Sequence, residues 1–140
     1  MLLSHEMQEA DLPVKTLISI IDDDESVREA LQGLVTSMGF RVEAFSSALD
    51  FLGRANIRDT SCLIVDVHMP RMTGIELHRR LVESGYAIPT ILITAYPDES
   101  VRLRAMADGV IGYLTKPCDS EELLACVSSA LKRAERGEHG

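Results

Sequence analysis

Residues 17–24 read LISIIDDD, an almost wholly apolar run that passes directly into three acidic residues. Four more short apolar runs follow along the chain, at residues 41–45, 62–67, 90–94 and 110–115. Several of them are apolar at consecutive positions, which is typical of strands that are covered on both faces. We therefore predict an α/β fold in which a parallel sheet lies between layers of helices, joined by right-handed crossovers.

The segments between the runs carry the signals of amphipathic helices. Ser26 and Glu29 form a capping-box pattern at the start of one apolar stripe, and Gly39 marks its end. The box recurs at residues 73–76, whereas residues 98–107 have only a thin apolar face and predict a weakly anchored helix. The last helix is predicted to begin at Asp119 and to place on its inner face Leu123, Leu124, Val127 and Leu131.

The composition fits a single globular domain whose core needs no disulfide bonds or structural metal ions. The chain has 140 residues, 46% of them apolar, and a net charge of −8. We place the domain at residues 16–134, between a polar extension at 1–15 and a tail at 135–140. An acidic chain repels a phosphate backbone, so direct nucleic-acid binding is not expected. No membrane span of ~20 apolar residues and no secretion signal is recognisable. Three cysteines follow no metal-ligand pattern and predict reduced thiols in a cytoplasmic protein: Cys62, Cys118 and Cys126.

Polar residues stand where the apolar runs end. Asp22 and Asp23 follow the first run, Asp66 lies in the third, Thr94 ends the fourth and Lys116 follows the fifth. Ligands bind beyond the carboxyl ends of parallel strands, so these side chains are expected to converge. Three carboxylates repel one another unless a cation screens them, and oxygen ligands favour a hard ion such as Mg²⁺. With a hydroxyl and an ammonium beside them, they are suited to phosphoryl transfer onto one aspartate.

Four motifs resemble those of the receiver domain of bacterial two-component response regulators. They are residues 20–24 (IIDDD), 64–70 (IVDVHMP), 92–95 (LITA) and 113–117 (YLTKP), within a similarity that spans residues 16–134. Among receivers, the chain is most similar to the FixJ-like regulators. The resemblance implies a single-domain, three-layer CheY-like fold of flavodoxin-like shape, with a five-stranded parallel sheet in the order 2-1-3-4-5.

The resemblance also implies the metal site and the acceptor. Asp66 would be the phospho-acceptor. Asp22, Asp23 and Asp66 would hold Mg²⁺, together with the backbone carbonyl of His68.

Further roles follow from the same resemblance. Thr94 and Lys116 would hold the phosphoryl oxygens, and a cis Lys116-Pro117 bond would aim the lysine into the pocket. Tyr113 would be the switch aromatic that swings inward when Thr94 is drawn to the phosphate.

The implied function is that of a cytoplasmic receiver in a phosphorelay. A sensor histidine kinase or a phosphotransfer protein would donate the phosphoryl group, and the chain would then signal to a downstream protein or to an output domain. It would assist its own phosphorylation and dephosphorylation without being a turnover enzyme. A homodimer through the last two strand–helix units is a further possibility.

Three alternatives stay open on the sequence. A haloacid-dehalogenase-like phosphatase also forms an aspartyl phosphate, but such a site has a second aspartate where this chain has His68. A nucleotide or flavin module needs a small-residue loop where residues 22–25 are acidic. A receiver that binds its partner without phosphorylation would share the whole fold.

A few positions differ from the family pattern or invite another interpretation. Asp24 makes a third acid after the first run, so the acid pair could shift by one residue. Cys118 stands where many receivers have Phe. Tyr96, two residues after Thr94, lies where it could screen the acceptor from water, and His78 is expected on a helix surface.

Overall fold

The computed structural model describes residues 16–54 and 56–135. The predicted extension at 1–15 and the part of the tail beyond residue 135 lie outside the described residues. No helix in the described part is long and apolar enough to cross a membrane. In chain order the elements are β1 (Leu17–Ile21), α2 (Glu25–Ser37), β2 (Arg41–Phe45), α3 (Ala48–Arg54), a 3-10 turn (Ile57–Asp59), β3 (Cys62–Asp66), α4 (Gly74–Glu83), β4 (Thr90–Thr94), α5 (Glu99–Ala107), β5 (Gly112–Thr115) and α6 (Ser120–Glu135).

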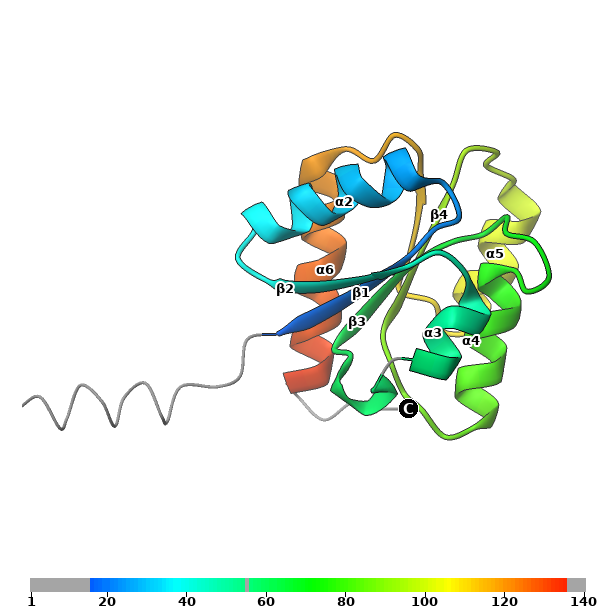
Figure 1. The fold of residues 1–140 in the computed structure, drawn as a ribbon. Helices are drawn as coiled ribbons and strands as arrows, with labels where there is room; N and C mark the ends of the chain where they lie inside the picture. The colour runs from blue at the N-terminus through cyan, green and yellow to red at the C-terminus, as the bar shows by residue number, and fades with distance from the viewer. Residues whose placement is uncertain (1–15, 55, 136–140) are drawn as a thin grey trace, which may run out of the picture.

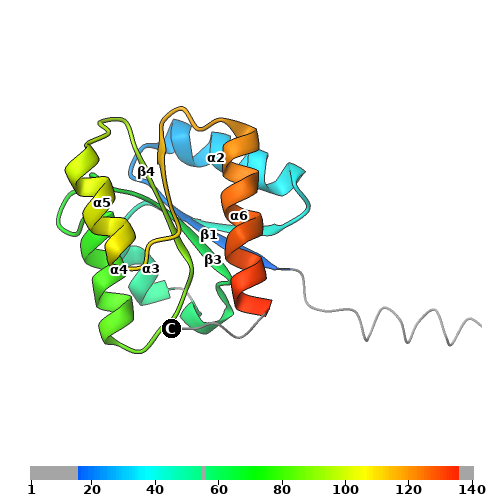
Figure 2. The same ribbon diagram turned by 180° about the vertical axis from the view of Figure 1, so that it is seen from behind.

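The five strands form one parallel sheet in the predicted order, β2-β1-β3-β4-β5. Helices α2 and α6 cover one face of this sheet, and α3, α4 and α5 cover the other (Figures 1 and 2). Every residue of β1, β3 and β4 is buried because helices cover both faces. This burial explains why these strands are apolar at consecutive positions. The predicted three-layer α/β fold is confirmed.

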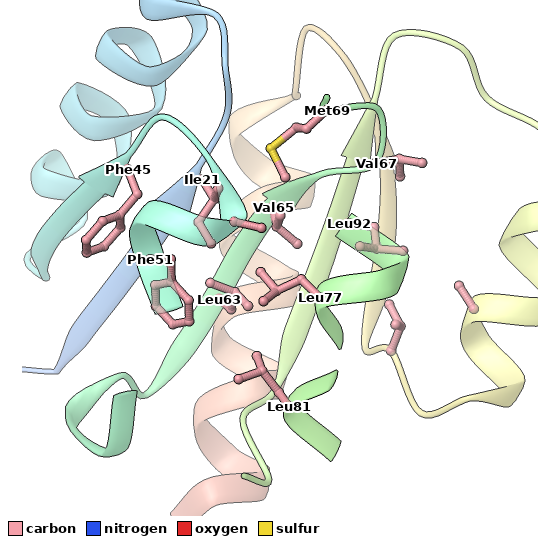
Figure 3. Packing of buried hydrophobic residues seen from close by; sticks show 13 residues of the cluster. Ile21, Phe45, Phe51, Leu63, Val65, Val67, Met69, Leu77, Leu81 and Leu92 are labelled. Carbon is pink, nitrogen blue, oxygen red and sulfur yellow. The ribbon is translucent and has the colours of Figure 1, made fainter. Parts of the chain in front are cut away.

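Each face of the sheet has its own apolar core. Beneath α3 and α4, Phe51 and Leu77 pack with Leu63 of β3 and Leu92 of β4 (Figure 3). The ring of Phe51 also meets that of Phe45 edge to face, with 5.3 Å between the centroids. Anchored on both faces, the central strands hold their carboxyl ends as a rigid support for side chains. The core beneath α2 and α6 contains Ile18, Ile20, Leu31, Val35, Ile64, Ile91, Ile93, Leu123 and Val127.

Capping boxes were predicted at the N-termini of α4 and α2. In α4 the box is confirmed, because the side chains of Thr73 and Glu76 each accept a hydrogen bond from the other residue's amide. In α2 the N-cap is Asp24, so the box predicted at Ser26 is wrong. Aspartate caps a helix as well as serine does, and the helix therefore begins earlier. The third acid of the run is thus a helix cap.

The last two helices differ in how firmly they are attached. In α5 only Ala105 is buried, and Leu103 is 55% exposed, as the thin apolar face predicted. In α6 Leu123 and Val127 are fully buried, but Leu124 is 42% exposed. Its predicted place on the inner face is wrong, because neighbouring helical residues point about 100° apart.

His78 is buried in α4 at 6% exposure, and its predicted place on a helix surface is wrong. It lies in the same buried stripe as Gly74, Leu77 and Leu81, at the spacing of a helix face. Burial lowers the pKa of the imidazole, Arg79 lowers it further, and Asp108 opposes them. The histidine is therefore held in its neutral form.

We expect this histidine to make the fold sensitive to acid. Its ordinary pKa is 6.5; above that pH neither state is protonated and the contribution to stability is fully present. Below it the imidazole binds a proton in the unfolded chain but not in the folded chain, so the free energy of unfolding falls. His78→Leu should reduce the fall, measured by denaturant unfolding at several pH values. Parallel pH profiles for the two proteins would contradict a buried neutral imidazole.

Candidate functional site

Four of the predicted site residues meet at one edge of the sheet. Asp66 is the last residue of β3 and Thr94 the last of β4, while Asp22 directly follows β1 and Lys116 directly follows β5. Because all the strands are parallel, these carboxyl ends face the same way. The sheet thus brings together side chains that lie far apart in the sequence, as predicted.

Lys116 links two buried carboxylates across this edge. Its Nζ lies 2.8 Å from Oδ2 of Asp22 and 3.3 Å from Oδ2 of Asp66. The Lys116 amide donates to the carbonyl of Thr94 at 2.8 Å, and the Lys116–Pro117 peptide is cis, as expected. Asp22 is fully buried, and among the described residues its Oδ2 accepts no hydrogen bond of good geometry. Its contact with the ammonium is therefore an ion pair.

Charge and burial shift the pKa values within this cluster. Burial raises the pKa of the Asp66 carboxyl, the charge of Asp22 raises it further, and Lys116 and the amide of His68 oppose them. For Lys116 burial acts to lower the pKa, but the contacts with Asp22 and then Asp66 outweigh burial and raise it. The lysine therefore stays an ammonium, and two carboxylates share its single positive charge.

A third carboxylate completes the acidic cluster. Ligand oxygens of Asp22, Asp23 and Asp66 all lie within 4.8 Å of one another, and Asp23 is exposed. Three converging carboxylates, two of them buried and one exposed to solvent, match a hard divalent cation that keeps part of its water. Oδ2 of Asp22 is paired only with the Lys116 ammonium, which cannot by itself neutralise all three acids. The residues present therefore fit a divalent metal ion.

His68 lies beside this cluster, two residues after Asp66. Its amide donates to Oδ1 of Asp66 at 3.3 Å, and its side chain is exposed. The ligand role of its carbonyl stays a prediction. Its ring meets that of Tyr96 edge to face, with 5.7 Å between the centroids.

The predicted switch residues lie on neighbouring strands. Thr94 is fully buried, and its Oγ1 accepts a hydrogen bond from the Tyr96 amide at 2.9 Å. Tyr113 is half-buried on β5, and its hydroxyl accepts a hydrogen bond from the Asp98 amide at 3.1 Å. Asp98 is the N-cap of α5. The tyrosine is thus tied to the start of the weakly attached helix.

Two features of the site escaped the sequence analysis. A Cβ atom on Gly74 would lie 2.5 Å from the carbonyl oxygen of Asp66, so α4 begins directly against the backbone of Asp66. The Gly74 amide also donates to the carbonyl of Val67 at 3.1 Å. A glycine just inside a capping box was the available signal. The contact between His68 and Tyr96 has no local signal, because it joins two loops that only the sheet brings together.

Comparison with known proteins agrees with this geometry. A family described as "response regulator receiver domain" matches residues 18–128. The chain belongs to this receiver family. The receiver is 43% identical over 120 residues to the response regulator protein TmoT of Ectopseudomonas mendocina, covering 86% of this chain and 54% of that protein. It is 34% identical over 124 residues to the transcriptional regulatory protein FixJ of Bradyrhizobium diazoefficiens, covering 89% of this chain and 60% of that protein.

Solved structures place the receiver in the same fold. The structure of the response regulator StyR has a TM-score of 0.81 at 40% identity, covering 89% of this chain and 64% of that one. The structure described as FixJ-N has a TM-score of 0.77 at 32% identity, covering 86% of this chain and 96% of that one. The resemblance to receivers, with FixJ among the relatives, is confirmed. The receiver spans about half the length of the curated relatives TmoT and TodT.

Gly74→Ala should lower the free energy of unfolding by about 2 kcal/mol, since the new methyl group overlaps the Asp66 carbonyl. Gly33→Ala is the matched control, because Gly33 lies inside α2 with nothing within 4 Å of a Cβ atom. This control should raise the free energy of unfolding by about 0.5–1 kcal/mol through helix propensity. Denaturant unfolding of both variants makes the comparison. Equal effects of the same sign would contradict the close approach of α4 to the Asp66 carbonyl.

Asp66→Asn should raise the thermal unfolding midpoint near neutral pH in metal-free buffer. The raised pKa means that the ionised carboxylate is less favourable in the folded than in the unfolded chain. This penalty is absent at low pH and appears as the pH rises through the folded-state pKa, so the gain should shrink on acidification. Differential scanning calorimetry at several pH values tests it, with the exposed Asp59→Asn as control. An equal midpoint for the two variants would contradict the crowding of charge at the site.

Proposed function

We propose that this receiver accepts a phosphoryl group on Asp66 from a phosphohistidine donor in a reaction that depends on Mg²⁺. One observation carries the proposal: the carboxylate of Asp66 ends a buried strand beside two other carboxylates and one ammonium. Membership of the receiver family supports it. According to this proposal, the receiver is a phosphoprotein that acts in a two-component system.

The chemistry needs a carboxylate oxygen that can reach the phosphorus of the donor, and charge compensation around it. One oxygen of Asp66 forms a bond to phosphorus while the bond from phosphorus to the donor imidazole nitrogen breaks. The bonding pair leaves with the imidazole, which takes up a proton. The product is an acyl phosphate on Asp66 and a free histidine on the donor.

Each neighbour of Asp66 has a part in this reaction. The Lys116 ammonium, 3.3 Å from Oδ2 of Asp66, is placed to bind a phosphoryl oxygen. The Thr94 hydroxyl, at the end of the adjacent strand, would donate a hydrogen bond to another. Asp22 and Asp23, with Asp66 and the His68 carbonyl, would hold Mg²⁺. When bound, this ion neutralises phosphoryl oxygens and reduces the repulsion between the acids.

Phosphorylation would be transmitted through the pair of Thr94 and Tyr113. If Thr94 turns toward the phosphoryl group, Tyr113 can move inward and give up its bond to the Asp98 amide. That bond holds the start of α5, a helix in which only Ala105 is buried. A small change at the site can therefore shift the population of α5 positions.

In this proposal the receiver accepts a phosphoryl group and later loses it again by dephosphorylation. It assists both steps without being a turnover enzyme. In the alternative, a haloacid-dehalogenase-like phosphatase, a second aspartate acts as acid and base, and this chain has His68 there. The alternative of a receiver that binds without phosphorylation leaves the acid cluster unexplained.

The partners proposed are those of the family. They are a histidine kinase or phosphotransfer protein as donor and, as target, a protein or output domain. Contact through α5, β5 and α6, including self-association, fits the loose attachment of α5. A cytoplasmic location is part of the proposal, because phosphohistidine donors are made from ATP there.

Incubation with Mg²⁺ and acetyl phosphate, a small phosphodonor, should add one phosphoryl group to the wild-type chain. Asp66→Asn should remain unmodified, because an amide nitrogen is not a nucleophile for phosphorus. Intact-mass spectrometry reads the result directly. Asp59→Asn is the matched control and should be modified as the wild type is.

Omission of Mg²⁺ with a chelator present should reduce the rate at least tenfold, as for other reactions that rely on metal-screened charge. Equal modification of Asp66→Asn and wild type would place the acceptor elsewhere. Steady release of phosphate from a generic phosphate ester by the wild type would favour the phosphatase instead.

A further inference from the structure

Arg28 makes a contact that the proposed reaction does not use. It is the fourth residue of α2, half-buried, and its Nη1 donates to the backbone carbonyl of Asp22 at 2.8 Å. The bond runs from a helix back to the loop that carries the acid pair. It is part-buried and charge-assisted, which makes it stronger than an ordinary surface hydrogen bond.

The position of Arg28 is unfavourable for a cation by itself. The first turn of a helix carries partial positive charge, so an arginine there is repelled by the helix dipole. Holding its long side chain in one conformation costs further entropy. The helix dipole therefore does not account for an arginine at this place, whereas the contact with Asp22 does.

The accepting carbonyl belongs to the peptide group that joins Asp22 to Asp23. The rest of Asp22 is already fixed: its amide donates to the carbonyl of Phe45 at 3.1 Å, and its Oδ1 accepts from the Asp24 amide at 2.9 Å. The Asp23 side chain is exposed, with no hydrogen-bond donor within the described part of the chain. The direction of Asp23 therefore depends on the plane of this peptide, which Arg28 holds.

We propose that Arg28 is a positioning residue for the metal site. It fixes the Asp22–Asp23 peptide so that the Asp23 carboxylate converges with those of Asp22 and Asp66, whose ligand oxygens lie within 4.8 Å of one another. Without the bond this peptide can rotate, and the exposed Asp23 moves away from the cluster. The inference rests on the proposed magnesium-dependent function and adds a residue outside the ligand set.

Charge alone predicts the opposite result, which makes the test decisive. Removing a cation near three carboxylates strengthens the attraction for Mg²⁺, whereas loss of positioning weakens binding. We expect Arg28→Met, which keeps length and helix propensity but has no donor, to weaken Mg²⁺ binding about tenfold, the usual effect of losing a partner of metal ligands. Arg28→Lys, which keeps a donor, should stay within about threefold of the wild type.

Calorimetric titration of Mg²⁺ into the metal-free full chain measures these affinities. Arg80→Met on α4 is the matched control: Arg80 is exposed, and losing it should leave the affinity unchanged or slightly higher. Hydrogen exchange in metal-free protein is the second measurement. The Asp24 amide, which donates to Oδ1 of Asp22, should exchange faster in Arg28→Met than in wild type or Arg80→Met. If Arg28→Met does not fold, both measurements are made on Arg28→Ala instead.

The outcomes separate the two proposals. Equal or tighter Mg²⁺ binding by Arg28→Met, with the wild type binding, would overturn the role of Arg28 and leave the proposed function standing. Unchanged exchange at the Asp24 amide would also overturn the role of Arg28. No Mg²⁺ binding by the wild type would overturn both proposals.

Discussion

The crowding of like charge at one edge of a parallel sheet is the constraint on which the rest of this receiver depends. Asp22 and Asp66 are both buried, and one lysine ammonium lies between them. Burying a carboxylate without compensation is costly, so the fold must deliver a cation to this place. Lys116 meets that need from the far end of the chain, at the end of β5. With Asp23 beside them, the acids still outnumber the cation, and this excess is what suits the site to a divalent cation.

The same edge explains how a local charge change can reach a distant surface. The Lys116 amide is bonded to the carbonyl of Thr94, so the two side chains that would contact a phosphoryl group share one backbone connection. Tyr113, on the strand that carries Lys116, reaches the N-cap of α5 through its hydroxyl. At its other end α5 is joined to α4 by an exposed ion pair between Arg79 and Asp108. Exposed pairs contribute little stability, so this contact holds the end of α5 only weakly.

The sequence was sufficient to predict the structure where the hydrophobic periodicity and the types of the polar residues indicate the same arrangement. The convergence of Asp22, Asp66, Thr94 and Lys116 follows from four apolar runs that lead into a polar residue. The sheet order followed from the family motifs. The sequence was insufficient where competing residues were chemically alike. Asp24 and Ser26 both cap helices well, and only the packed chain shows which one does. His78 was misplaced because a polar residue in an apolar stripe was assigned by its type rather than by its position.

Contacts made by backbone groups were hardest to foresee. The requirement for Gly74 arises from the distance between α4 and the Asp66 carbonyl, and the bond of Arg28 ends on a carbonyl that every residue possesses. Neither leaves a side-chain pattern in the sequence. Both nevertheless act on the residues that hold the charge, because each touches the backbone of an acid whose carboxylate belongs to the cluster. In this receiver the ligand set can be read from residue types, whereas its geometry depends on neighbours that are chemically unremarkable.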